Sequence, residues 1–441
     1  MGRYIPQQNL ENLKKYAYKG VDKSLLSGYV LNPFWTWFVT LWPLNIAPNT
    51  ITLTGLSIIF LNFFTLIYYD PCYLTEKDGS PDQGPPQWIY FTWGFSLFAY
   101  QTLDAIDGKQ ARRTGMAGPL GELFDHGCDA LNTTLEVILA SRALGLGRSW
   151  WTVASQIATL ANFYLTTWEE YHTGQLYLGY FSGPVEGILM IVAIYIISGF
   201  YGPGFWEQGI WTFTRLNHVP LISRLPDLPL NESFMVFGAL GLGFNIITSY
   251  MNVRRALSLK SKSSSAGHLT HSTTPPLLLL FPFLLTSILQ ILWLSHPKFN
   301  NSYIIDSAAF VPFLCAWGLQ FAHMVGRMIL AHVTKDKFPV WDWVWVWSFL
   351  GGLDANLPLF GMSPIIQRSQ KHTTIFVWIT LAVSFIAYAR FVTLVIGDIT
   401  EYLGVACFRV QRRDANGVWR DAKEQIQGNG SIPSTPKGKK A

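Results

Sequence analysis

The chain has 441 residues and a formal net charge of +5; half of its residues are apolar and only 13 % are charged. That charged share is about half of what a typical soluble domain carries. The apolar residues form long runs, for example residues 51–69, 234–247 and 375–389. The composition therefore excludes a soluble globular protein and indicates an integral α-helical membrane protein. We expect no nucleic-acid partner.

The amino-terminal segment, residues 1–46, differs from the rest because its beginning is polar and basic. The first 30 residues lack the apolar core of a cleavable signal peptide, so no such peptide is expected. Residues 23–42 mix aromatic side chains with a few charges and are expected to lie in the membrane interface. We predict a cytosolic and interfacial segment here.

Ten later segments are apolar and long enough to span a bilayer, which requires roughly 20 residues of helix. The predicted spans are residues 47–69, 88–113, 119–141, 150–168, 181–200, 233–252, 276–295, 304–333, 340–361 and 374–398. We therefore predict an all-α fold, a polytopic membrane helix bundle with about ten transmembrane helices.

Two polar stretches interrupt or follow these spans. Residues 257–276 contain a Ser- and Lys-rich run and are expected to form a cytosolic linker. Residues 401–441 are expected to form a cytosolic, partly disordered tail, with disorder from about Arg412 onward. Most of the 32 Lys and Arg residues fall on the side of the amino terminus, so both termini are expected in the cytosol.

Acidic side chains recur at helical spacing in residues 103–134, which read LDAIDGKQARRTGMAGPLGELFDHGCDALNTT. Asp104 and Asp107 are three residues apart and Asp125 and Asp129 four apart, so each pair shares one face of a helix. Between the pairs lies a helix breaker that ends in a proline suited to the first turn of a new helix. The pattern predicts an antiparallel hairpin of two membrane helices.

The hairpin places the four carboxylates at a similar depth. Asp107 and Asp125 each lie roughly 10 Å from the connecting turn at about 1.5 Å per residue. Unpaired carboxylates just inside the membrane would repel one another and lose hydration, and Arg112 offsets only one charge. Divalent cations with a preference for oxygen ligands, Mg²⁺ or Mn²⁺, are the expected partners of Asp104, Asp107, Asp125 and Asp129.

Small residues flank the aspartates at Gly108, Ala111 and Gly121. Backbone without bulky side chains can admit a diphosphate beside the metals. The alternative is that these residues permit tight helix packing. Together with the aspartates, they favour a ligand-accommodating role.

These residues form a recognisable motif. The pattern Asp107-Gly108-x2-Ala111-Arg112-x8-Gly121-x3-Asp125-x3-Asp129 resembles the signature of the CDP-alcohol phosphotransferases, and Asp104 matches an additional upstream aspartate. Residues 47–52 (APNTIT), 118–129 (GPLGELFDHGCD) and 167–173 (TWEEYHT) are similar to the eukaryotic, most closely fungal, cholinephosphotransferases and ethanolaminephosphotransferases.

The resemblance implies a reaction and a location. Phosphocholine or phosphoethanolamine would pass from CDP-choline or CDP-ethanolamine to the hydroxyl of diacylglycerol, with release of CMP. The four aspartates would hold two Mg²⁺ or Mn²⁺ ions across the diphosphate. The enzyme would reside in the endoplasmic reticulum or Golgi membrane, with its active site facing the cytosol. Residues 47–200 would form the catalytic core, and residues 201–400 the lipid-acceptor region, in which a homodimer contact is also conceivable.

The resemblance also assigns donor-binding roles. Arg112 and Lys109 would neutralise phosphate charge. Asn49 matches a family position near the nucleotide. Gly108, Ala111 and Gly121 would leave room for the donor.

Two candidates could take the proton of the attacking hydroxyl, Asp129 and His126, since imidazole is a common base near neutral pH. Glu186, at the start of an apolar span, is expected to hydrogen-bond to His126 and orient it. A structural histidine beside the metals is the alternative. Other polar groups carry weaker hypotheses: His323, Arg327 and His332 are expected mainly to brace the bundle, and Glu169 and Glu170 to lie at a solvated helix end.

Two rival functions differ in class or in substrate. A cation transporter also places carboxylates in a membrane, but acids gathered at one depth and the accompanying small residues favour the transferase. A related transferase with another lipid acceptor, such as ceramide, stays open. The sequence leaves choline against ethanolamine, and the oligomeric state, undecided.

Overall fold

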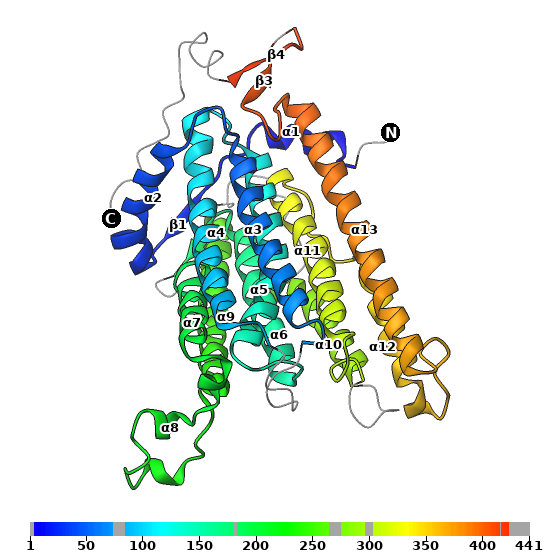
Figure 1. The fold of residues 1–441 in the computed structure, drawn as a ribbon. Helices are drawn as coiled ribbons and strands as arrows, with labels where there is room; N and C mark the ends of the chain where they lie inside the picture. The colour runs from blue at the N-terminus through cyan, green and yellow to red at the C-terminus, as the bar shows by residue number, and fades with distance from the viewer. Residues whose placement is uncertain are drawn as a thin grey trace.

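The computed structural model describes residues 4–73, 84–179, 183–263, 275–295, 303–414 and 416–422, and over these residues the protein is a bundle of long helices with two very small sheets. Figure 1 shows the long helices running alongside one another, with α1, β3 and β4 at one end of the bundle and α8 at the other. The helical part of the all-α prediction is confirmed.

Each predicted span overlaps a helix in the described part of the chain, but the α-helices within predicted spans 181–200 and 340–361 are shorter than those spans. The long helices are α3 (Pro48–Tyr69), α4 (Gln87–Thr114), α5 (Pro119–Ala143), α6 (Trp150–Thr173), α7 (Ile188–Tyr201), α9 (Leu230–Ser263), α10 (Phe281–Leu294), α11 (Phe310–Thr334), α12 (Val346–Asn356) and α13 (Gln370–Leu403). The short α-helices are α1 (Gln7–Leu13), α2 (Asn32–Phe38) and α8 (Ile210–Phe213). Single 3₁₀ or π turns are Ser27–Leu31, Val39–Leu41, Gly183–Gly187, Pro203–Glu207, Ile222–Arg224, Pro276–Leu280, Trp343–Trp345 and Leu357–Phe360.

Five helical segments in the described part of the chain are long and apolar enough to cross a membrane. They are Pro48–Tyr69, Leu230–Leu259, Pro276–Leu294, Phe310–Thr334 and Gln370–Leu403. They support an integral membrane protein. Helix α12 has 11 residues, and at about 1.5 Å per residue it is shorter than a hydrocarbon core of roughly 30 Å. The count of about ten spans therefore stays a prediction.

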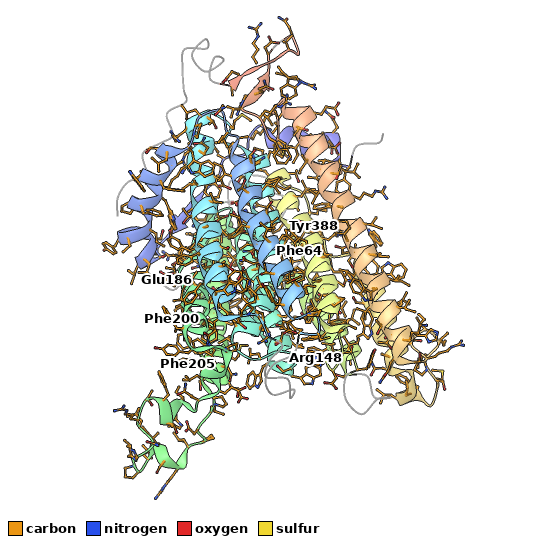
Figure 2. All side chains as sticks on the ribbon, in the orientation of Figure 1. Phe64, Arg148, Glu186, Phe200, Phe205 and Tyr388 are labelled. Atoms are coloured by element: carbon orange, nitrogen blue, oxygen red, sulfur yellow. The ribbon has the colours of Figure 1, made fainter. Side chains whose placement is uncertain are left out.

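Helix α11 lies at the centre of the bundle, because 78 % of its apolar window is buried, against 6 % for α9. Its contact with α5 is close: a Cβ added at Gly318 would lie 2.3 Å from Oγ1 of Thr134, so only glycine fits there. The α9 helix instead leaves its apolar side chains exposed, as a helix at a lipid-facing edge does. Figure 2 shows how densely side chains fill the space between the helices.

The amino-terminal segment is tied to the ends of several helices. The backbone N–H groups of Tyr4 and Ile5 donate to Oδ2 of Asp398 at 2.7 and 2.8 Å, and Nδ2 of Asn12 donates to the carbonyl of Thr334 at 2.8 Å. Strand β1 (Gly20–Asp22) pairs in parallel with β2 (Leu176–Leu178), directly after α6. The segment is therefore an integral part of this end of the bundle.

The carboxyl-terminal segment is more ordered than its composition suggests. Strands β3 (Gln411–Arg413) and β4 (Trp419–Asp421) form an antiparallel hairpin, and Nη2 of Arg412 donates to the carbonyl of Gly115 at 2.7 Å. The expectation of disorder from Arg412 onward is wrong for this hairpin, because pairing and a bond to the α4–α5 turn hold it. Residues 423–441 lie outside the described residues, as do residues 264–274 of the predicted linker, while α9 continues through Ser263.

A buried ion pair joins the ends of α3 and α5 at the opposite end of the bundle from α1. Nε of Arg142 lies 2.6 Å from Oδ2 of Asp70, and both side chains are buried. We expect Asp70→Asn to lower the unfolding free energy by about 3–5 kcal/mol, because it leaves a buried cation without its counter-charge. The measurement is the thermal unfolding midpoint in detergent. As a control, Arg420→Ala removes an exposed pair with Asp414 and should change the midpoint little; equal shifts would contradict the assignment.

Candidate active site

The turn between α4 and α5 forms as its residues predict. Helix α4 ends at Thr114, and Gly115 has a left-handed backbone with φ of 70°. Glycine adopts this conformation at no steric cost, which ends the helix cleanly. Pro119 then occupies the first turn of α5. The two helices that carry the aspartates therefore leave one turn at the same end of the bundle.

Three of the four aspartates meet at one point. Carboxylate oxygens of Asp104 and Asp107 from α4 and Asp125 from α5 all lie within 4.8 Å of one another. Oδ1 of Asp104 and Oδ1 of Asp125 are buried and have no hydrogen-bond partner among the described residues. Buried carboxylates without donors are costly unless a cation approaches, so this oxygen-rich set fits a hard divalent ion.

The remaining carboxylate interactions involve two hydroxyls that the sequence did not reveal. Thr52 of α3 donates to Oδ2 of Asp107, and the hydroxyl of Tyr100 donates to Oδ1 of Asp129 at 2.5 Å. Asp129 is outside the three-carboxylate group, so its role as a metal ligand stays a prediction. Thr52 lies one turn after Asn49 and Tyr100 one turn before Asp104; that helical spacing is the signal that could have found them.

The small residues border open space. The nearest side-chain atom to a Cβ added at Gly121 would be Oδ1 of Asn49, at 4.0 Å, and one added at Gly108 would meet only Nη1 of Arg112, at 3.8 Å. Neither glycine is therefore needed for helix packing at these positions. Ala111 is buried in α4. Of the two explanations for the glycines, room for a ligand agrees better with this geometry.

The basic residues differ in position. Arg112 is exposed, and its guanidinium lies over Gly108, beside the aspartates. The ammonium of Lys109 instead donates to Oδ1 of Asn32 at 2.7 Å and to Oγ1 of Thr36 at 3.2 Å, which fastens α4 to α2. The structure thus engages Lys109 with α2, whereas Arg112 lies next to Gly108 in the motif.

A cavity of about 330 Å³, within the size range of ligand pockets, lies between the start of α3, the α4–α5 turn and the two terminal segments. Asn49 and Gly121 lie in its wall, and Nδ2 of Asn49 donates to Sγ of Cys407 at 3.5 Å. Lys14 and Arg412 add positive charge from the two terminal segments. A cavity with two basic side chains in its wall suits an anionic ligand.

The predicted hydrogen bond between Glu186 and His126 is not formed. Nδ1 of His126 contacts the carbonyl of Glu122 at 3.0 Å, and its Nε2 lies 4.0 Å from Oε2 of Glu170. Glu186 instead accepts a hydrogen bond from Oγ of Ser24 at 2.6 Å, because the amino-terminal segment passes over the start of α7. Glu170 is only 3 % exposed, so the expectation of a solvated helix end was wrong.

Tyr18 lies in the segment that leads into β1, and its phenol lies near two of the aspartates and near Glu170 of α6. Partial burial, together with the negative charges of Glu170 and two of the aspartates, raises the pKa of Tyr18 to about 12. The phenol therefore stays protonated at neutral pH and can donate a hydrogen bond. The sequence alone does not reveal Tyr18, because this residue approaches α5 and α6 only when β1 pairs with β2.

The polar residues of α11 divide into two groups. Nδ1 of His323 lies 2.6 Å from Oδ2 of Asp342, and Nη1 of Arg327 donates to the carbonyl of Trp341 at 2.5 Å. These two residues brace α11 against the segment before α12, in agreement with the structural hypothesis. His332 lies apart from them, with Nε2 3.9 Å from Oε1 of Glu122.

Comparison with known proteins agrees with the motif and the geometry. Residues 45–214 match the CDP-alcohol phosphatidyltransferase family. Over 416 residues the chain is 38 % identical to cholinephosphotransferase 1 of Saccharomyces cerevisiae, covering 93 % of this chain and 99 % of that protein. The chain belongs to the CDP-alcohol phosphatidyltransferase family. Two further members of the family are similar over nearly their full length: choline/ethanolaminephosphotransferase 1 of the same yeast, 35 % identical over 427 residues, and choline/ethanolaminephosphotransferase 1 of Arabidopsis thaliana, 33 % identical over 431 residues.

The open space at Gly121 can be tested directly. We expect Gly121→Leu to fold normally but to lower kcat/KM for a CDP-alcohol at least about tenfold, a loss of roughly 1.4 kcal/mol, because the side chain enters the space beside Asn49. Gly241→Leu is the matched control, since a Cβ at Gly241 in α9 meets nothing within 4 Å and this glycine is exposed on a helix outside the aspartate hairpin. Equal activity of the two variants would contradict a ligand at Gly121.

Proposed function

We propose that the protein transfers phosphocholine or phosphoethanolamine from the corresponding CDP-alcohol to diacylglycerol and releases CMP. The observation that carries the proposal is the convergence of three carboxylates, one buried and two half-buried, from two helices beside space that two glycines leave open. The names of its full-length relatives, cholinephosphotransferase and choline/ethanolaminephosphotransferase, support the choice of donor.

The aspartates would hold the metal ions. Asp104, Asp107 and Asp125, with Asp129 as the fourth candidate, form an oxygen-only set that fits two Mg²⁺ or Mn²⁺ ions. When bound, such ions neutralise a diphosphate and stabilise the attacking and leaving oxygens of an in-line displacement. The hydroxyl of Thr52 holds the carboxylate of Asp107 in place from α3, which fixes that ligand before the ions arrive.

The donor would lie between α3, α4 and α5. Asn49 would contact the nucleotide, and Arg112 would pair with a phosphate oxygen. Gly108, Ala111 and Gly121 would let the diphosphate approach the backbone closely. Lys109 acts through α2 instead, because its ammonium is engaged with Asn32 and Thr36.

The reaction needs a base for the acceptor's hydroxyl. As the hydroxyl oxygen bonds to the β-phosphorus, the bond from that phosphorus to the oxygen bridging to CMP breaks, and the hydroxyl proton leaves. We assign the proton to Nε2 of His126, whose Nδ1 is held by the carbonyl of Glu122. Glu170, 4.0 Å from Nε2, would stabilise the imidazolium. Asp129 is the alternative base, while Glu186 is engaged by Ser24.

The proposal also covers the topology of the chain and the membrane in which it resides. About ten spans, both termini in the cytosol and an active site at the cytosolic side of the endoplasmic reticulum or Golgi membrane form part of the proposal, supported by the excess of basic residues on that side. Acids at one depth argue against a cation transporter, in which they would follow a path across the bilayer.

Loss of one aspartate should abolish turnover. We expect Asp107→Asn to lower kcat by more than about 10³-fold while the unfolding midpoint changes little, because the variant keeps the shape of the side chain but removes an anionic ligand. The assay is transfer of radiolabelled CDP-choline and CDP-ethanolamine, in competition, to diacylglycerol. Chelation of divalent ions should have the same effect. Full activity of Asp107→Asn would reject the assignment.

The role of His126 makes a separate prediction. We expect His126→Ala to lower kcat by about 10²–10⁴-fold and to remove the imidazole limb of the pH–rate profile, because the group that accepts the proton is lost. His172→Ala serves as control, since this histidine of α6 packs against Trp168 and Tyr171. A profile of unchanged shape in His126→Ala would transfer the role of base to Asp129.

A further inference from the structure

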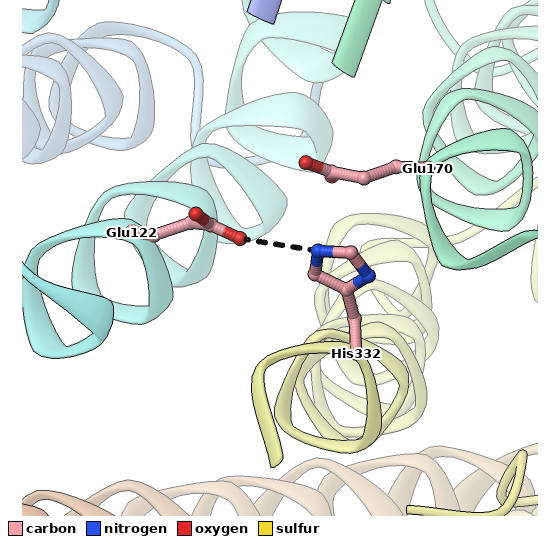
Figure 3. A group of neighbouring side chains, drawn as sticks. All are labelled: Glu122, Glu170 and His332. Carbon is pink, nitrogen blue, oxygen red and sulfur yellow. Dashed lines mark ion pairs between the residues drawn. The ribbon is translucent and has the colours of Figure 1, made fainter. Parts of the chain in front are cut away.

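A second group of side chains with metal-binding chemistry lies beside the aspartates. Glu122 of α5, Glu170 of α6 and His332 of α11 each present one ligand atom, and these atoms lie within 4.8 Å of one another. Figure 3 shows the Glu122 carboxylate and the His332 ring facing each other, with the Glu170 carboxylate extending toward the space between them. The three residues come from three different helices of the bundle.

The carboxylate of Glu122 lacks close partners. Both of its oxygens are buried and make no hydrogen bond within the described part of the chain, and its side chain is only 3 % exposed. Nε2 of His332 lies 3.9 Å from Oε1 of Glu122, beyond the distance of a hydrogen bond. A buried carboxylate in this state is costly, and a cation at about 2.0–2.2 Å from the same oxygen would remove the cost.

We propose that Glu122, Glu170 and His332 form a binding site for one divalent transition-metal ion, with Zn²⁺ as the best fit. An imidazole nitrogen combined with carboxylate oxygens suits Zn²⁺ and its neighbours in the first transition row, whereas Mg²⁺ prefers oxygen alone. The aspartate set, which has oxygen ligands only, differs in this respect. The protein would thus have two kinds of metal site, one for each class of cation, with Glu122 about one helix turn before Asp125 on α5.

The site has a consequence for catalysis that rests on the proposed function. Glu170 belongs to the metal-binding group and also lies 4.0 Å from Nε2 of His126, while the carbonyl of Glu122 holds Nδ1 of the same ring. An ion bound by both glutamates would draw the Glu170 carboxylate away from Nε2 of His126, a contact that the proposed function uses. We therefore expect Zn²⁺ to inhibit transfer at saturating Mg²⁺, acting on kcat rather than on KM for the donor.

Binding of Zn²⁺ by the purified full-length protein without an affinity tag tests the site independently of activity. In excess Mg²⁺, calorimetric titration should detect about one Zn²⁺ per chain. Glu122→Gln and His332→Ala should each weaken this binding at least about tenfold, since even outer contacts of a metal ligand are worth that much. His218→Ala, which removes an exposed histidine from the loop after α8, should bind like the unchanged protein.

Asp107→Asn separates this proposal from the function proposed above, because it removes an aspartate and leaves the second group intact. Zn²⁺ binding that survives in Asp107→Asn but is lost in Glu122→Gln supports the site even if no transfer is measured. X-ray absorption of the Zn²⁺-loaded protein without substitutions does not depend on whether any variant folds. We expect it to show an imidazole together with oxygen ligands around the ion. Absence of imidazole scattering, or undiminished binding in both Glu122→Gln and His332→Ala, would overturn the proposal.

Discussion

The central constraint on this protein is the cost of keeping carboxylates charged inside an apolar helix bundle. Asp104, Asp107 and Asp125 meet where water is scarce, so each must be stabilised by a hydroxyl, a cation or both. Thr52 supplies a hydroxyl to Asp107, and Tyr100 supplies one to the neighbouring Asp129. Metal ions can balance the remaining negative charge and can in turn bind a phosphate-bearing substrate. Without such a counter-charge, the desolvated carboxylates would carry a high free-energy cost.

The same constraint explains why both terminal segments gather at one end of the bundle. The amino-terminal segment brings Tyr18 toward the acidic groups and Ser24 to Glu186. The carboxyl-terminal hairpin brings Arg412 to the α4–α5 turn. Polar and basic side chains from outside the spans thus complete a site whose carboxylates come from within them.

Histidine and glutamate pairs extend the polar region sideways from the aspartates. Nε2 of His126 lies 4.0 Å from Glu170, and Nε2 of His332 lies 3.9 Å from Glu122. Both distances are about 1 Å longer than a hydrogen bond. Pairs this long retain electrostatic attraction but not the directional bond, so a small movement, a proton or a cation can change which partner each carboxylate prefers. This adaptability would suit the proposed role of His126 as a base, which must gain and then lose a proton in each turnover.

The sequence by itself determined the helical bundle, the α4–α5 turn and the approach of the aspartates, because apolar runs, Gly115, Pro119 and a spacing of three or four residues act locally. It could not determine which acid faces His126. Glu186 was predicted because an unpaired carboxylate in an apolar span is costly, but Glu170 is the acid that lies 4.0 Å from Nε2 of His126. Nor did it place Tyr18, Lys109 or the terminal hairpin. These depend on how α3, α6 and α11 pack around α5 and on strand pairing between distant residues, and such contacts are decided by the burial and hydrogen bonding of the whole chain, not by any local pattern.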